Sequence, residues 1–140
     1  MDRLPVIETP RLRLRPRRMG DLEDCLAMDR EPDTARWIDA PWDDPRAHRA
    51  FVEARIRGPW PPGMGHWVVS PRDAPARFLG WVLLLPENTV GPRIELGWRI
   101  RTAARGRGYA PEAASAVLGH GTATLGLRHV IALIHRENTA

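Results

Sequence analysis

The stretch Arg105-Gly106-Arg107-Gly108-Tyr109-Ala110 decides the fold expected for this chain, because of the segments on either side of it. Before it, residues 94–101 (IELGWRIR) alternate large apolar and polar side chains, which is typical of a half-buried strand. After it, residues 111–118 (PEAASAVL) begin with proline and continue in good helix formers. A strand, a glycine-containing turn and a helix N-terminus together present free N–H groups and the positive end of a helix dipole. With Arg105 and Arg107 adding charge, this segment predicts a phosphate or pyrophosphate site.

Two common phosphate-binding loops do not fit this stretch. A dinucleotide-binding turn needs G-x-G-x-x-G, and here Pro111 stands where the third glycine would be. A P-loop needs a lysine after its last glycine, and the chain contains no lysine at all. The spacing therefore excludes both classes of loop.

The stretch resembles the acetyl-CoA loop of GNAT-type N-acetyltransferases, written (Gln/Arg)-x-x-Gly-x-(Gly/Ala), with Arg105, Gly108 and Ala110 at its fixed positions. The resemblance implies that acetyl-CoA is the acetyl donor, with its pyrophosphate on the loop amides and its pantetheine arm along the end of the preceding strand. The family often carries a CoA-contacting asparagine after the next strand, and Asn138 stands at that point. The cofactor-binding residues implied in this way are Ile100, Arg101, Thr102, Arg105, Gly106, Arg107, Gly108, Tyr109, Ala110 and Asn138.

The resemblance extends over nearly the whole chain in family order. Residues 7–15 (IETPRLRLR) look like the first strand of the branch that includes ribosomal-protein N-terminal (alanine) acetyltransferases. Residues 19–24 (MGDLED) look like the turn into the first helix of that branch. The implied fold is α+β in three layers, with a mixed, mostly antiparallel central sheet flanked by helices. We expect one N-acetyltransferase-like domain over residues 1–140.

The chain departs from the family at its C-terminal end. Relatives continue after the position of Asn138 with another helix and a final strand pair, whereas this sequence stops at Ala140. That segment usually completes the opening for pantetheine and often supplies the group that protonates the departing thiolate. We therefore expect a domain truncated before its last helix and strand pair. A fragment, a truncated gene and completion by another chain, such as a homodimer partner, all stay open.

The composition is that of a compact globular domain. Hydrophobic residues make up 43% and charged residues 27% of the 140 residues. No apolar run approaches the roughly 20 residues of a membrane helix, and the N-terminus lacks the apolar core of a secretory signal. The only cysteine, Cys25, cannot form an internal disulfide, which agrees with a reducing compartment. We expect a cytoplasmic protein without a membrane partner.

The basic character of the chain comes entirely from arginine. The isoelectric point is about 10.8, but the formal net charge is only +4, and arginine accounts for all 21 basic side chains. Arginine does not deprotonate near pH 10, so it raises the isoelectric point without a large net charge. Residues 11–18 (RLRLRPRR) alternate like a strand with leucine inward and arginine outward. No helix-turn-helix, aromatic RNA-binding motif or paired zinc ligands are present, so we expect no specific nucleic-acid partner.

Hydrophobic periodicity and turn residues predict a mixed order of strands and helices. Pro16 closes the first strand, Asp43-Asp44-Pro45 supplies a cap and a first-turn proline for the second helix, and Gly58-Pro59 stops that helix. The expected strands are 11–15, 65–70, 78–85, 94–101 and 128–135, and the expected helices are 21–29, 45–57 and one that follows the loop and is capped by Gly126. The helical faces expected are Leu22, Cys25 and Leu26 pointing inward in the first helix, Ala47, Phe51 and Ala54 sharing one face of the second, and Ala114, Leu118, Gly121 and Leu125 pointing inward in the third.

Acetyl transfer to an amine needs a group that takes a proton from the acceptor. Glu95 is the candidate base, because many relatives carry a glutamate in this strand and burial among apolar neighbours would raise its pKa. The alternative is a Glu95 that points to solvent or pairs with an arginine. His66 and His135 are the next candidates, since a neutral imidazole needs less tuning. We expect Tyr109 to pack beside the cofactor and not to act as a general acid.

The remaining histidines do not predict a metal site. His48, His120 and His129 show no ligand spacing with one another or with Cys25. Acetyl-CoA is therefore the only co-substrate expected besides the acceptor.

The sequence gives less information about the chemical class of the acceptor than about the cofactor. Trp37, Trp42 and Trp60 flank the second helix, on the side where the family binds its acceptor. They can form an aromatic wall for a substrate or anchor proline-rich loops, and the second role is the commoner one. The nearest approach to an acidic cluster is Asp39 with Asp43 and Asp44. A peptide N-terminus or an amine with an apolar body is therefore favoured over a polyamine.

Three classes of function follow from the sequence. The first is an N-acetyltransferase that moves an acetyl group from acetyl-CoA to a primary amine, such as a protein N-terminus or a small amine. The second is a catalytically impaired CoA-binding remnant or regulatory domain. The third, ranked below both, is a basic nucleic-acid-binding protein.

Overall fold

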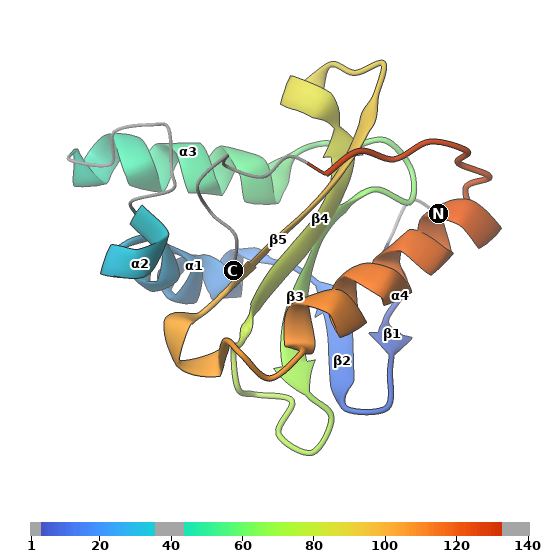
Figure 1. Cartoon of the computed structure of the whole chain (residues 1–140). Coiled ribbons are helices and arrows are strands. Elements are labelled where there is room, and N and C mark those ends of the chain that lie inside the picture. The colour runs from blue at the N-terminus through green and yellow to red at the C-terminus, as the bar shows by residue number, and fades with distance from the viewer. Residues whose placement is uncertain (1–3, 36–43, 133–140) are drawn as a thin grey trace.

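The computed structural model describes residues 4–35 and 44–132 of the chain. The strands are β1 (Ile7–Glu8), β2 (Leu12–Pro16), β3 (Gly65–Pro71), β4 (Gly80–Pro86) and β5 (Ile94–Ile100). The α-helices are α1 (Leu22–Asp29), α2 (Pro32–Ala35), α3 (Pro45–Arg57) and α4 (Tyr109–Ala123), and the short 3-10 helices are η1 (Met19–Asp21), η2 (Glu87–Thr89) and η3 (Thr102–Ala104). The strands form one antiparallel sheet in the order β1-β2-β3-β4-β5 (Figure 1).

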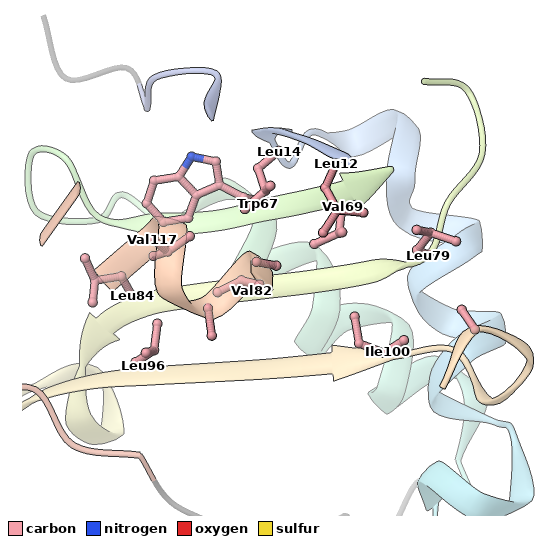
Figure 2. Packing of buried hydrophobic residues seen from close by; sticks show 13 residues of the cluster. Leu12, Leu14, Trp67, Val69, Leu79, Val82, Leu84, Leu96, Ile100 and Val117 are labelled. Carbon is pink, nitrogen blue, oxygen red and sulfur yellow. The ribbon is translucent and has the colours of Figure 1, made fainter. Parts of the chain in front are cut away.

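The sheet lies between two helical layers. Helix α4 packs on one face, and α1 and α3 pack on the other (Figure 1). Along β4, Val82 and Leu84 point toward α4, whereas Leu83 and Leu85 point toward α1 and α3. A strand buried on both faces needs an uninterrupted apolar run, which the sequence of β4 supplies. Figure 2 shows the α4 side of this core, with Val117 of the helix packed over the sheet. The predicted α+β architecture with an antiparallel sheet is confirmed.

The arginine-rich strand β2 follows the predicted alternation. Leu12 and Leu14 are fully buried. The ion pairs made by the arginines beside them are Arg11 with Glu112, Arg13 with Glu8, and Arg15 with Asp21. These charges thus serve contacts within the chain, which agrees with a structural role for the cluster.

Helix α3 begins and ends as predicted. The Asp44 carboxylate accepts a hydrogen bond from the Arg46 amide (3.0 Å), and Pro45 occupies the first turn. Gly58 ends the helix in the left-handed region, with φ of 66°. In α1 the residues expected to point inward, Leu22, Cys25 and Leu26, are buried.

The buried face of α3 is not the face formed by Ala47, Phe51 and Ala54. That face is exposed, and His48 and Val52 are the buried side chains of the helix. The sequence pattern was ambiguous because alanine carries little information about burial. A histidine can replace an apolar residue in this layer because the neighbouring helix α1 supplies a hydrogen-bond partner for its ring.

The buried face of α4 also differs from the predicted face. Ala114 and Gly121 are buried as predicted, but Leu118 is 38% exposed and Val117 occupies the core instead. Ala113 is fully buried as well, so the small residues bring the helix close to the sheet and set its rotation. Leu118, one position beyond Val117, then lies at the rim of the interface between α4 and the sheet, so the prediction that Leu118 points inward is wrong.

The chain after α4 differs from the expected cap and strand. The helix ends at Ala123, and Gly126 instead makes a later turn, with φ of 68°. Leu125, expected on the helix, lies past its end and packs against the core. Of the predicted strand 128–135, the described part forms an isolated parallel bridge between Ile131 and Glu95. Residues 133–135 lie outside the described residues.

Candidate active site

The predicted strand, turn and helix are present around the glycine-rich loop. Strand β5 runs into η3, and the loop leads into α4 at the lower end of the sheet (Figure 1). Gly106 and Gly108 both adopt the left-handed region, with φ of 77° and 78°, which explains why glycine is needed there. A side chain at Gly106 would meet no heavy atom within 4 Å. The loop therefore has free space outside it and the amides of the first helical turn beside it, as a bound phosphate requires.

The two arginines of the loop have different positions. The Arg105 guanidinium donates to the Ile100 carbonyl (3.0 Å) and to Thr34 Oγ1 (2.8 Å). Arg105 therefore ties the loop to the end of β5 and to α2. Both arginines are exposed, but the Arg105 guanidinium is engaged in these two hydrogen bonds, so Arg107 is the one placed to meet an anion from solvent.

A second set of contacts, which sequence reasoning missed, holds the loop from the opposite side. Arg11 Nε donates to Glu112 Oε1 (2.7 Å), and Arg11 Nη1 donates to the Arg107 carbonyl (2.8 Å). The Arg11 guanidinium also lies 4.9 Å from the centre of the Tyr109 ring. The Glu112 carboxylate accepts further hydrogen bonds from Thr9 Oγ1 and the Arg11 amide. We call Arg11 and Glu112 the loop clasp; an acidic residue in the first turn of α4 was the available signal for it.

One edge of β5 is available next to this loop. The Arg101 amide donates to Leu79 on the β4 side (2.8 Å). Because backbone groups alternate between the two edges of a strand, those of Ile100 and Trp98 point to the opposite edge. On that edge the Leu96 amide donates to Ile131 (2.8 Å), and the bridge at Glu95 is the only pairing among the described residues. Between this bridge and the loop no described strand pairs with this edge, although the Ile100 carbonyl on it accepts from the Arg105 guanidinium.

This alternation separates the residues expected along the pantetheine arm. Ile100 faces the open edge, whereas the amide of Arg101 is used by Leu79. The amide of Thr102 donates to Glu31 Oε1 (2.9 Å). Asn138 lies outside the described residues.

Glu95 lies on the sheet face that α1 and α3 cover. It is half-buried and stands opposite Leu85 in the register of β4 and β5. Burial raises the pKa of its carboxyl, against the opposing effect of the positive charge of Arg55, and Glu87 raises it further. A carboxylate with a raised pKa is a better proton acceptor than an ordinary glutamate.

His66 lies on the same face, two strands away. It is buried, and its ring makes an edge contact with Trp81 at 5.2 Å between centroids. Burial lowers the pKa of His66 well below 6.5, and the charges of Arg17, Arg55 and Arg99 lower it further. The imidazole is therefore neutral at physiological pH. His135, the other histidine considered, lies outside the described residues.

The remaining buried histidines have structural contacts. His48 Nε2 lies 2.9 Å from Asp29 Oδ2, and the other oxygen of Asp29 pairs with Arg99. This group links α1, α3 and β5. His120 Nε2 lies 2.9 Å from the Gly63 carbonyl. In the described part of the chain, no group of three or more His, Cys, Asp or Glu residues gathers as metal ligands would.

A model of the acetyltransferase (GNAT) domain matches residues 11–140. The chain belongs to the GNAT acetyltransferase family. This acetyltransferase also matches many solved structures of the same kind. An acetyltransferase from Agrobacterium tumefaciens is 26% identical to it, with a TM-score of 0.77 and coverage of 97% of this chain and 77% of that one. A GNAT family acetyltransferase from Bacillus anthracis is 23% identical, with a TM-score of 0.78 and coverage of 96% and 76%.

A third neighbour comes from Vibrio cholerae and is provisionally named a ribosomal-protein-serine acetyltransferase. It is 22% identical, with a TM-score of 0.72 and coverage of 99% of this chain and 78% of that one. At 22% identity, this similarity shows only that the two proteins share a fold. No curated protein sequence matches the chain significantly.

Family membership establishes the general reaction. GNAT acetyltransferases use acetyl-CoA as co-substrate and act on amine acceptors, and the chain is an acetyl-CoA-dependent acyltransferase of this kind. Among the described residues of the acetyltransferase, no helix is long and apolar enough to span a membrane.

Proposed function

We propose that this acetyltransferase transfers the acetyl group of acetyl-CoA to the primary amine of a protein N-terminus or a small molecule. The observation that carries the proposal is the left-handed pair Gly106 and Gly108, which sits between an open strand edge and a helix N-terminus. The pyrophosphate would bind to the amides from Gly106 to Ala110, with the exposed Arg107 in the same loop. Residues 1–140 would act as one N-acetyltransferase domain.

The pantetheine arm would run along the open edge of β5. Its amide groups can pair with the backbone of Trp98 and with the Ile100 amide, in the manner of an added strand. The Ile100 carbonyl already accepts from Arg105. Arg101 and Thr102 would contribute less, because their amides already donate to Leu79 and Glu31. Asn138 is retained as a further CoA contact on the family resemblance alone.

Glu95 would act as the general base. Bound acetyl-CoA supplies a thioester, and the protein must deprotonate the acceptor ammonium so that its nitrogen lone pair can attack. The raised pKa of the Glu95 carboxyl supports this role. So does the position of Glu95 at the bridge to Ile131, where the unpaired part of the β5 edge begins. His66, neutral but buried and flanked by cations, is the second candidate.

The test of the proposal is CoA binding to a loop variant. Gly108→Glu places a side chain where φ is 78° and a negative charge beside the expected pyrophosphate. We expect calorimetric titration to show at least a hundredfold weaker CoA binding. Gly119→Glu is the matched control, because this glycine is an exposed residue of α4, the helix that follows the loop, and a side chain there would meet nothing within 4 Å. Equal CoA affinity in the two variants would refute the loop as the cofactor site.

A further inference from the structure

We propose that a polar pocket on the same sheet face as Glu95 binds a carboxylate of the acceptor, so that the preferred acceptor is an amine that also carries an acid group. This inference rests on the proposed amine acetylation. The pocket, which we call the anion pocket, has a volume of about 170 Å³ and is lined by Arg17, Arg55, Trp60, Met64 and His66, among others. Every lining residue belongs to the described part of the chain.

Arg17 is the main reason to expect an anion in this pocket. Its Nε and Nη2 atoms are buried and have no hydrogen-bond partner among the described residues. Its Nη1 contacts the Cys25 sulfur at 3.9 Å. Burial raises the pKa of the Cys25 thiol, so this thiol stays protonated and does not balance the arginine. A buried guanidinium without an ion-pair partner is costly, and an anion that reaches it recovers that cost.

Arg55 adds a second cation from helix α3. Its guanidinium lies 5.3 Å from the centre of the Trp60 ring and 5.6 Å from that of Phe51. Neither Arg55 nor Arg17 belongs to an ion pair within the described residues. Aromatic rings hold the guanidinium in place without neutralising it.

The other charged groups described around the pocket offset the two arginines only in part, because Asp29, which acts on Arg17, is already shared with Arg99 and His48. The His66 imidazole is neutral, because burial and the neighbouring arginines lower its pKa. Arg99, the third cation near His66, is paired with Asp29. Glu95 is the acid that interacts with Arg55, and the raised pKa of its carboxyl shows that this interaction does not overcome burial. The pocket therefore carries net positive charge and would repel a polyamine.

The sheet register places this pocket within reach of the candidate base. His66 stands opposite Leu83, and Leu83 stands opposite Gly97. Glu95 lies two residues further along β5, hence on the same face. With about 4.8 Å between strands and about 3.4 Å per residue, the Cα atoms of His66 and Glu95 are about 12 Å apart. An acceptor with its amine at Glu95 would extend toward the His66 end of this span, where Arg17 and Arg55 line the same pocket as His66.

The experiment compares matched acceptors. The probes are 6-aminohexanoate and its neutral amide, and a pair of short peptides with Asp or Asn as the second residue. We expect kcat/KM to be at least about tenfold higher for the acid of each pair, as for a charge-assisted hydrogen bond. In Arg17→Gln and in Arg55→Gln the ratio should fall toward one. Arg57→Gln, an exposed arginine on the same helix, should keep the full ratio.

A binding measurement separates this inference from the proposed function. Calorimetry with 6-acetamidohexanoate and its amide, in the presence of CoA, reports the anion pocket without turnover. Binding of the acid that is lost in Arg17→Gln would support the pocket even if no amine were acetylated. Equal kcat/KM for acid and amide in an active enzyme would overturn it. So would a loss of CoA affinity in Arg17→Gln, since the pocket would then serve the cofactor.

Discussion

Glu95 is set apart at the level of single residues by the balance of burial and charge around it. Its carboxyl is half-buried and has a raised pKa, while the nearby Arg55 favours the ionised form. Burial therefore makes this carboxylate accept a proton more readily than an exposed glutamate. The raised pKa comes from the position of Glu95 on the sheet face that α3 covers. The alternating pattern of β5 alone did not show whether this face is buried.

Glu95→Gln tests this role directly. We expect kcat to fall by about 10²–10⁴-fold, the usual effect of losing a general base, while CoA affinity stays close to that of the parent protein. The loss should be largest where the acceptor amine is protonated and should shrink as pH approaches the pKa of that amine. Steady-state rates across pH, with CoA titration as the control, measure both effects. Full activity at every pH would move the role to His66 or to a water chain.

At the scale of elements, the loop clasp joins the start of β2 to the first turn of α4. Desolvation acts to raise the pKa of Glu112, but hydrogen bonds from Thr9 and Arg11 outweigh it and lower that pKa. The carboxylate is therefore ionised at neutral pH and can hold Arg11 against the loop carbonyl of Arg107. The clasp orients the cofactor loop without requiring that Arg11 touch the cofactor.

Removing the clasp should weaken cofactor binding moderately. We expect Arg11→Gln and Glu112→Gln each to weaken CoA binding by roughly three- to tenfold, since the pair is half-exposed and contributes modestly. The double variant should lose little more than either single one, because both changes break the same interaction. Arg13→Gln, which loses only a long ion pair of 3.8 Å, is the control for calorimetric titration. Additive losses would show that the two residues act independently.

For the whole molecule, the neutral buried His66 makes stability depend on pH. The pKa of His66 in the folded protein is well below its ordinary value of 6.5. Below pH 6.5 the unfolded chain therefore binds a proton that the folded protein does not, and the free energy of unfolding decreases. The stability is complete above pH 6.5 and is lost as pH falls toward the folded pKa.

Chemical denaturation between pH 7.5 and pH 5.5 measures this effect. One proton gives a slope of at most about 1.4 kcal/mol per pH unit. His66→Phe keeps an aromatic ring beside Trp81 but cannot be protonated, so its stability should fall less over this range. His129→Phe, at an exposed histidine, should follow the parent protein. Parallel curves for His66→Phe and the parent would contradict a depressed pKa.

Local chemistry in the sequence was sufficient for the cofactor loop and the order of elements. Glycines that adopt positive φ, Pro45 in a first helical turn and alternating apolar residues act on their immediate neighbours, so residues 94–118 could be interpreted without knowing the rest of the chain. The resemblance of the same loop to GNAT acetyltransferases pointed to the family, which the match over residues 11–140 confirms.

Only the tertiary structure decided which side chains meet. The loop clasp joins Arg11 to Glu112, and Arg17 and Arg55 both act on His66, across separations that no local pattern encodes. The tertiary structure also determined which faces of α3 and α4 are buried. Helical periodicity shows which residues share a face, but packing against the sheet and the neighbouring helices determines which face is buried. Short-range backbone preferences fix turns and strands, whereas ion pairs, burial and pKa values depend on sheet register and layer packing. That is why the cofactor loop was predicted from the sequence and the anion pocket was not.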